Sequence, residues 1–404
     1  MTTFKKNLYI LSIVQFFAMA GLSSIVPFLP LFIRDLGITD LNATAMWSGW
    51  VFSAPFIIAF LITPIWGNLG DKYGRKIMLV RAAFGLAISQ LLIGFSQDVY
   101  QLFFFRILQG LLSGFFPASI AFIASNAPRE KSGYAMGLLQ SSNVTGNIVG
   151  PLIGGVISDL LGYRNVFLIV GLIVFAASFL ILFFVKEEHK PDKSQKSYSL
   201  LENWRYLINS RLLRYFTFFV MLSALTVALI RPILVLYIES FHVERGFLPT
   251  ITGLILSTIG IFSAISAVYL GRTIDKPGSV KKLIIASCIS SLMFMAHYFL
   301  SDLYSLFFVN VVLGLSYGII NPIIYATISK NTDNTRKGGI MGIASSSQFF
   351  GNMVGPILSG YLVGWVGLRF SFIISGLIIS LIALFSIKFL RHKKEFSPSD
   401  KDGL

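Results

Sequence analysis

The stretch Gly67-Asn68-Leu69-Gly70-Asp71-Lys72-Tyr73-Gly74-Arg75-Lys76 is short, charged and rich in glycine. A long apolar run ends just before it (46–66), and another begins just after it (77–95). Each run is close to the roughly 20 apolar residues that a helix needs to cross a membrane. Glycine allows the close approach and left-handed dihedrals of a tight turn, and the lysine and arginine side chains favour its cytoplasmic side. The stretch therefore predicts a cytoplasmic turn between two membrane helices.

Composition supports the same class of protein along the whole chain. Of the 404 residues, 55% are hydrophobic and only 13% are charged, and the mean hydropathy is +0.75. A soluble domain carries about 25% charged residues, so this composition excludes one. We expect an all-α integral membrane protein with twelve transmembrane helices, at 8–33, 46–66, 77–96, 99–125, 133–157, 164–185, 213–238, 249–270, 282–300, 303–328, 338–362 and 368–390.

The net charge of +15 could indicate nucleic-acid binding, but its distribution does not. The basic residues gather at the two termini and in the even-numbered loops, where the positive-inside rule places the cytoplasm. Only four lie on the opposite side, namely Arg34, Arg164, Arg245 and Arg369. The charge therefore predicts cytoplasmic termini, attraction to anionic lipid and no nucleic-acid partner.

A polar segment at 187–212 divides the chain into two sets of six apolar runs. We expect N-terminal and C-terminal six-helix bundles at 1–186 and 213–392, a cytoplasmic linker at 187–212, and a cytoplasmic tail at 393–404. A helix over 200–208 could lie on the membrane within the linker.

The two halves align at an offset of 204–205 residues. Gly49 aligns with Gly253, Arg164 aligns with Arg369, and 146–151 repeats as 351–356. This pattern predicts two pseudo-symmetric bundles, the build of a secondary transporter with its substrate site near mid-membrane.

The opening stretch resembles the loop signature G-x-L-x-D-x-x-G-R-K of the major facilitator superfamily. The resemblance implies that Asp71 is part of a gating switch with Gly67, Gly74, Arg75 and Lys76. The carboxylate would pair with Arg75 or a helix N-terminus in only one conformational state. The simpler alternative is a solvated loop charge.

The repeat of this loop contains Asp275, but it has lost the Gly-Arg-Lys ending. We include Asp275 in the predicted switch. Residues 26–31, 46–49 and 131–137 also resemble the MdtG-like group of bacterial multidrug exporters. This resemblance implies a monomer in the bacterial inner membrane that uses the proton gradient and no cofactor.

Two arginines, Arg106 and Arg231, fall inside apolar runs. A charge there costs at least about 2.5–3.5 kcal/mol on insertion scales, so each should face a cavity or a partner. The alternatives are snorkelling of Arg106 to the outer surface and a position of Arg231 near the outer boundary, with Glu239 as a candidate partner. The segment from Arg106 through Gln109 to Gly114 resembles the fourth-helix motif of drug exporters, which implies a part for the arginine in proton transfer or substrate binding.

The segment Gly146-x-x-x-Gly150-Pro151-x-x-Gly154-Gly155 combines small residues with a proline. Small residues four apart let helices approach closely, and a proline removes a backbone donor and can bend the helix. A packing seam without directional meaning would explain both features. The full pattern resembles the antiporter signature of drug–proton exporters, which implies export.

No Asp or Glu falls in the middle of a predicted helix. We therefore expect a small-molecule substrate that is neutral, zwitterionic or anionic. Asp35 and Asp71 remain as candidates for carrying the proton. The scattered histidines and the single cysteine, Cys288, which we expect to be a packing residue, form no metal set, and no nucleophile–base pair predicts an enzyme.

These features together predict a secondary active transporter that exports small amphipathic compounds by proton antiport and alternating access. The alternative is a dedicated exporter of one metabolite, such as a siderophore or another anionic or zwitterionic compound, or a lipid mover.

Overall fold

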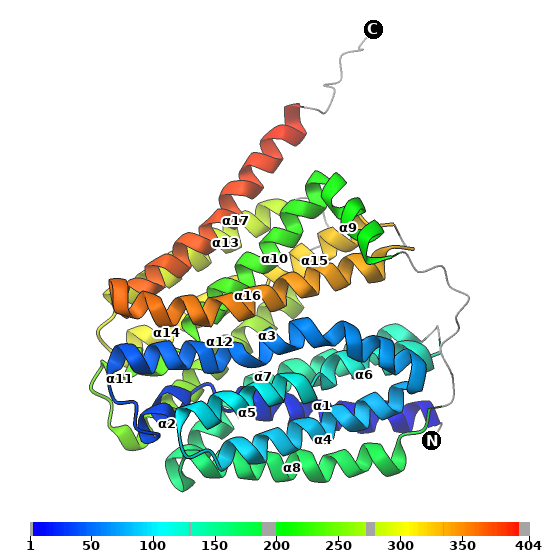
Figure 1. Ribbon diagram of the computed structural model, residues 1–404. Coiled ribbons are helices and arrows are strands. Elements are labelled where there is room, and N and C mark those ends of the chain that lie inside the picture. Colours follow the sequence, from blue (N-terminus) through cyan, green and yellow to red (C-terminus); the bar gives the residue numbers. More distant parts are fainter. Residues whose placement is uncertain (1–2, 129–130, 188–198, 272–278, 334, 396–404) are drawn as a thin grey trace. The chain divides into compact units, whose positions relative to one another are not determined.

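The computed structural model describes residues 3–128, 131–187, 199–271, 279–333 and 335–395, and these ranges contain helices and no strand (Figure 1). Contacts divide the chain into two compact units. Unit 1 comprises Met1–Gln195, Ala228–Gly260 and Asn352–Leu368, and unit 2 comprises Lys196–Val227, Ile261–Gly351 and Arg369–Leu404. Each unit takes segments from both sequence halves, so this grouping differs from the six-plus-six division, which stays a prediction.

Unit 1 contains all helices of the first half and parts of the second. Its helices are α1 (Thr3–Ser23), α2 (Leu29–Asp35), α3 (Leu41–Tyr73), α4 (Arg75–Gly94), α5 (Val99–Leu112), α6 (Phe115–Asn126), α7 (Ser132–Leu161), α8 (Tyr163–Phe184), α11 (Leu234–Glu239), the 3-10 turn η2 (Arg245–Phe247), and portions of α10, α12 and α16.

Unit 2 contains the rest of the described chain. Its helices are α9 (Leu200–Asn209), α10 (Arg211–Ile230), α12 (Leu248–Gly271), α13 (Ser279–Ala296), η3 (His297–Phe299), α14 (Leu303–Tyr317), α15 (Ile320–Lys330), α16 (Lys337–Val366) and α17 (Phe370–Glu395), of which α10, α12 and α16 continue into unit 1. The helix expected in the linker is thus present as α9, and Ser199 and Glu202 form a reciprocal capping box at its start.

Eleven helical segments of the described chain are long and apolar enough to cross a membrane, from Leu41–Thr63 to Phe370–Lys388. They coincide with eleven of the twelve predicted runs. The run predicted at 8–33 is interrupted between α1 and α2, and Pro30 lies in the first turn of α2. Twelve crossings therefore remain a prediction.

Other runs that we expected to be continuous are also broken. The run at 99–125 is interrupted at Ser113 and Gly114, where Gly114 has φ +100°. The run at 213–238 is interrupted between α10 and α11, where Pro232 lacks a backbone donor. The expectation of one continuous helix through Arg231 is therefore wrong, because Arg231 lies in this break and is half-buried.

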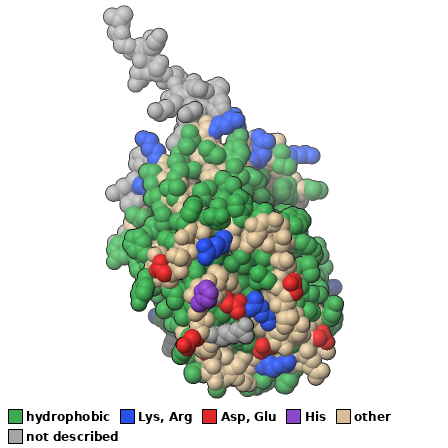
Figure 2. Space-filling model, turned by 90° about the vertical axis from the view of Figure 1, so that its left-hand side faces the viewer, with side chains coloured by type: hydrophobic (Ala, Val, Ile, Leu, Met, Phe, Trp, Pro, Cys, Tyr) green, Lys and Arg blue, Asp and Glu red, His purple; other side chains and the backbone are tan. Residues whose placement is uncertain are grey.

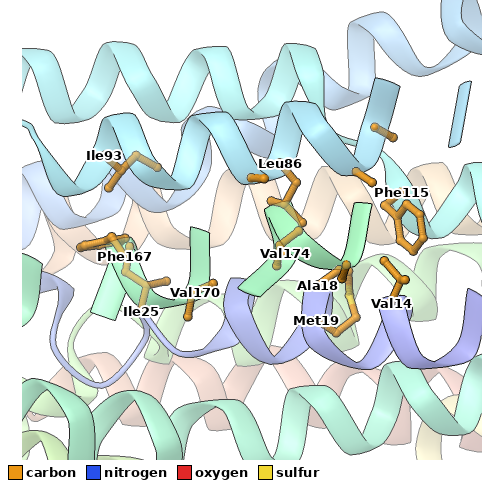
Figure 3. Packing of buried hydrophobic residues seen from close by; sticks show 14 of the residues in the cluster. Val14, Ala18, Met19, Ile25, Leu86, Ile93, Phe115, Phe167, Val170 and Val174 are labelled. Atoms are coloured by element: carbon orange, nitrogen blue, oxygen red, sulfur yellow. The ribbon is translucent and has the colours of Figure 1, made fainter. Parts of the chain in front are cut away.

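The core of the first-half bundle is formed by interleaved aliphatic and aromatic side chains. Figure 3 shows Leu86 and Ile93 of α4 turned toward α8, from which Phe167, Val170 and Val174 extend. All five are at most 9% exposed. This packing fixes the helices on which the candidate site is built.

The end of unit 1 where α2 and α11 lie is called the outer end here, following the charge prediction. Figure 2 views this end and shows acidic side chains next to lysine or arginine side chains. Two acids at this end, Asp40 and Asp98, accept hydrogen bonds from backbone N–H groups of Ala43 and Gln101, both at 2.8 Å. They are helix N-caps. In unit 2, Cys288 is exposed, so our prediction of a packed cysteine is wrong.

Candidate functional site

The glycine-rich segment of α7 presents two different faces. Gly146, Gly150 and Gly154 lie four residues apart and face α1 and the residue that follows it. A Cβ atom on them would come within 2.7 Å of the Phe16 carbonyl oxygen, 2.1 Å of Ser23 Oγ and 2.1 Å of the Ser24 carbonyl oxygen, respectively. No side chain fits at these distances. The three glycines therefore allow α1 and α7 to pack backbone to backbone within the first half.

Pro151 and Gly155 lie on the adjacent face of α7 and meet α12, a helix of the second half. A Cβ atom on Gly155 would lie 2.4 Å from the Pro249 carbonyl oxygen. In return, a Cβ atom on Gly253 of α12 would lie 2.3 Å from the Pro151 carbonyl oxygen. We call this contact the α7–α12 seam; it lies entirely within unit 1.

An equivalent contact joins α3 to α16, also within unit 1. A Cβ atom on Gly49 would lie 2.3 Å from the Pro356 carbonyl oxygen, and one on Gly360 would lie 2.8 Å from that of Ala45. Gly49 is the counterpart of Gly253 in the sequence repeat, and Pro356 is the counterpart of Pro151. We call this contact the α3–α16 seam.

The same hydrogen bond fastens both seams. Ser257 Oγ donates to the Ile148 carbonyl at 2.6 Å in the α7–α12 seam. Ser53 Oγ donates to the Met353 carbonyl at 2.7 Å in the α3–α16 seam. The two donors are counterparts in the sequence repeat, and so are the two acceptors. The two seams are therefore equivalent contacts related by the repeat.

One additional contact distinguishes the two seams. An Asp159 carboxylate oxygen at the end of α7 accepts a hydrogen bond from the Thr250 backbone N–H at 2.9 Å, and another from the Thr250 hydroxyl. This carboxylate caps the N-terminus of α12 across the seam. The corresponding positions in the α3–α16 seam hold Gly364 and Met46, which cannot form such a pair.

An ion pair also joins the halves at the outer end. Arg34 Nη1 of α2 lies 2.9 Å from Glu239 Oε1 and 2.6 Å from Glu239 Oε2 of α11. The two side chains are 22% and 23% exposed. The pair is therefore partly shielded from water, and salt screens it less than a fully exposed pair.

Arg106 is buried, at 4% exposure, and has partners on two helices. Its Nε donates to the Val51 carbonyl oxygen at 3.0 Å and its Nη1 donates to Gln109 Oε1 at 2.5 Å. Val51 is four residues before Pro55, which has no N–H, so the Val51 carbonyl lacks its normal intrahelical donor. Arg106 thus completes the hydrogen bonding of α3; its part in transport stays a prediction.

The hydrogen bonds described above for Arg106 run to Val51 and Gln109, and not to Asp35 or Arg231, the other residues predicted for coupling or substrate binding. Asp35 lies at the exposed end of α2. Partial desolvation raises the pKa of the Asp35 carboxyl, and the nearby Arg164 guanidinium opposes this shift. Their predicted roles in coupling or substrate binding remain predictions.

The loop that opened the sequence is held by an acid from further along the chain. Gly74 has φ +108°, which favours glycine. The Glu187 carboxylate accepts from the backbone N–H groups of Arg75 at 2.9 Å and Lys76 at 3.0 Å, and the Arg75 guanidinium donates to the Ala121 carbonyl. Glu187 therefore fixes the start of α4.

Gly67, Asp71 and Asp275 are the remaining residues of the predicted switch. A Cβ atom on Gly67 would meet nothing within 4 Å. The Asp71 side chain and Asp275 lie outside the described part of the chain. The switch stays a prediction.

Sequence reasoning missed several members of this arrangement. Ser53 and Ser257 share one position of the repeat and could have been found by extending the alignment. Asp159 and Glu187 carried no signal beyond charge, because their partners are backbone N–H groups. Among the described residues, no group of three histidine, cysteine or acidic side chains could hold a metal ion.

Comparison with known proteins gives consistent results. The model of the Major Facilitator Superfamily matches residues 11–331 and 216–403. The chain is 34% identical over 390 residues to proteins called multidrug resistance protein MdtG from Salmonella paratyphi A and Salmonella typhimurium, covering 96% of each chain.

Solved structures share the fold at low sequence identity. A bacterial homolog of the human lysosomal transporter Spinster, in an inward-facing and unoccupied conformation, has a TM-score of 0.79 at 14% identity and covers 98% of this chain and 99% of its own. The human organic anion transporter MFSD10 has a TM-score of 0.68 at 16% identity, with 96% and 100% covered.

Proposed function

Because the chain belongs to the major facilitator superfamily, we propose that it is a multidrug exporter that works by proton antiport and alternating access. Its membership makes it a multi-pass membrane transporter and points away from an enzyme. The relatives that are 34% identical over nearly the whole chain are called multidrug resistance proteins. Their names support drug export here.

The pair of outer seams is the observation that carries alternating access. Such a transporter must close one end by contact between its halves and then release that contact. Here α7 meets α12 and α3 meets α16 through glycines that leave backbone against backbone. A contact with so few interlocking side chains separates without repacking a core, which suits a surface that opens in every cycle.

In this proposal twelve helices cross the inner membrane of a bacterium, with 1–186 and 213–392 as the two bundles and both termini cytoplasmic. The protein acts as a monomer. The substrate is neutral, zwitterionic or anionic, because the predicted apolar runs contain Arg106 and Arg231 but no carboxylate. Asp35 and Asp71 are the candidate proton carriers, and the Asp71 loop acts as the cytoplasmic switch.

Purified protein in liposomes with an acidic lumen and an internal pH reporter tests this proposal. Cationic, neutral and anionic compounds are added in turn to the wild type, Arg106→Ala and Arg106→Lys. We expect neutral or anionic compounds to make the lumen more alkaline, with loss of the response in Arg106→Ala and partial retention in Arg106→Lys.

The other outcomes separate the parts of the proposal. A response to cations alone would keep the antiporter and refute the predicted substrate charge. A response to one compound only would favour a dedicated exporter, and no response to any compound would refute proton antiport.

A further inference from the structure

The Arg34–Glu239 ion pair occupies a special place in the sequence repeat. Position 34 plus the offset of 205 is position 239, so the two partners are each other's counterparts. The elements that carry them match as well, since α2 begins at Leu29 and α11 begins at Leu234. Each of these short helices follows a proline, Pro27 or Pro232, at the same offset.

This equivalence fixes where the pair lies. Parallel repeats are related by a pseudo-two-fold axis along the membrane normal. A residue that contacts its own counterpart must lie close to that axis, as in any isologous contact. The two seams lie on either side of the axis, because each seam joins residues of the two halves that are not counterparts in the repeat. The ion pair therefore lies between the two seams, on the axis.

The ion pair can form only when α2 and α11 lie together at the outer end. Both Glu239 oxygens lie within 2.9 Å of Arg34 Nη1, and both side chains are mostly buried. Separation of α2 from α11 would leave one charge of each sign at the outer end without this partner. Their attraction therefore favours the closed arrangement of the outer end.

We infer that Arg34 and Glu239 form the central outer gate of this transporter, an ion pair on the pseudo-two-fold axis that must separate for a compound to leave. This inference rests on the proposed alternating access. Arg34 and Glu239 act as positioning residues, since nothing requires them to touch the substrate. The gate adds a charge-dependent element to seams that otherwise consist of glycine, proline and serine.

The equivalence of the two positions provides an unusual test. Exchange of the charges, Arg34→Glu with Glu239→Arg, restores an ion pair across the axis with its ends reversed. Each single variant instead places two like charges against each other. A positioning role that depended on only one side chain would not be restored by the exchange.

Distances across the outer end report the state of the gate. Spin labels are placed at two exposed positions, Leu41→Cys at the first residue of α3 and Phe247→Cys just before α12, in a Cys288→Ala background. We expect each single variant to raise the population with long distances about fivefold relative to the wild type. The double variant should return it to within about twofold. Arg34→Gln provides a milder variant if the reversals do not fold.

A charge reversal in another loop that the charge distribution predicts to be on the outer side serves as a control. Arg369 is exposed and belongs to unit 2, and Arg369→Glu should leave the distances unchanged. Unchanged distances in both single variants and in Arg34→Gln would overturn the inference, and so would a double variant that stays as open as the singles. The distances are measured without substrate, so failure of the gate is distinguishable from failure of drug export, which the liposome assay tests on the wild type.

Discussion

Replacement of Gly253 by alanine should open the outer end. The added Cβ would lie 2.3 Å from the Pro151 carbonyl oxygen, about 1 Å closer than packed atoms approach. The neighbouring atom is helix backbone, so the seam itself must separate. Overpacking of this kind costs about 1–3 kcal/mol, which corresponds to a roughly 5- to 150-fold shift toward the open state.

The cost falls on only one of the two states. Alanine stabilises a helix by roughly 1 kcal/mol relative to glycine, but this gain is present whether the seam is closed or open and cancels from their ratio. Gly342→Ala on α16 is the matched control, because a Cβ atom there would meet nothing within 4 Å. The control should gain helix stability without a change in conformation.

Distances between labels at Leu41→Cys and Phe247→Cys measure the shift. We expect Gly253→Ala to populate longer distances while Gly342→Ala matches the wild type. Gly49→Ala should give a shift of similar size, since its Cβ would also lie 2.3 Å from a proline carbonyl oxygen. Unchanged distances in both seam variants would refute the assignment of these glycines to a closing contact.

Three further predictions follow from individual contacts. Arg106→Ala should destabilise the protein by about 1–3 kcal/mol, because it leaves buried polar groups unpaired. In a Pro55→Ala background, residue 55 again has an N–H for the Val51 carbonyl, so the loss of stability should be about 1 kcal/mol smaller. Equal losses of stability in the two backgrounds, measured by thermal unfolding, would contradict this. Asp159→Ala should remove about 0.5–2 kcal/mol of capping from the closed state, whereas Asp159→Asn should keep most of it, so equal outer-end distances in the two variants would contradict the cap. Backbone and side-chain donors of Ser305 lower the pKa of the Asp302 carboxyl. The ionised carboxylate therefore stabilises the fold above its unfolded pKa, and this stabilisation is lost as the pH falls through the folded pKa. Below about pH 4 the stability of Asp302→Asn should therefore depend less steeply on pH than that of the wild type, and parallel curves of stability against pH would contradict this.

The apolar runs and the repeat predicted most of the helices, because a membrane helix must carry its signal in its own composition. The breaks were harder to predict. Pro55 and Pro151 lie inside continuous α3 and α7, whereas the chain near Pro232 leaves the helix. A proline alone does not decide between these outcomes, since neighbouring groups such as the Arg106 side chain can satisfy the carbonyl that it leaves unpaired.

The glycine pattern of α7 predicted a close seam but not its partners. Gly154 packs on the C-terminal end of α1, at Ser24 just beyond it, while Gly155, one residue later, packs on α12. Sequence spacing does not say which helix lies on which face. The partners of Asp159 and Glu187 were beyond sequence reasoning for a similar reason. Backbone N–H groups are present at every residue except proline, so an acid that caps a distant helix has no partner side chain to reveal it.

Distances at both ends of the same protein test the central claim, that the outer seams close one end of an alternating-access transporter. Labels at Leu41→Cys and Phe247→Cys report the outer end. Labels at the exposed Tyr73→Cys and Tyr269→Cys lie next to the two loops that the sequence predicts to be cytoplasmic, and they report that end. The account predicts that Gly253→Ala lengthens the outer distance and shortens the other one. Lengthening at both ends, or no change at either, would contradict it.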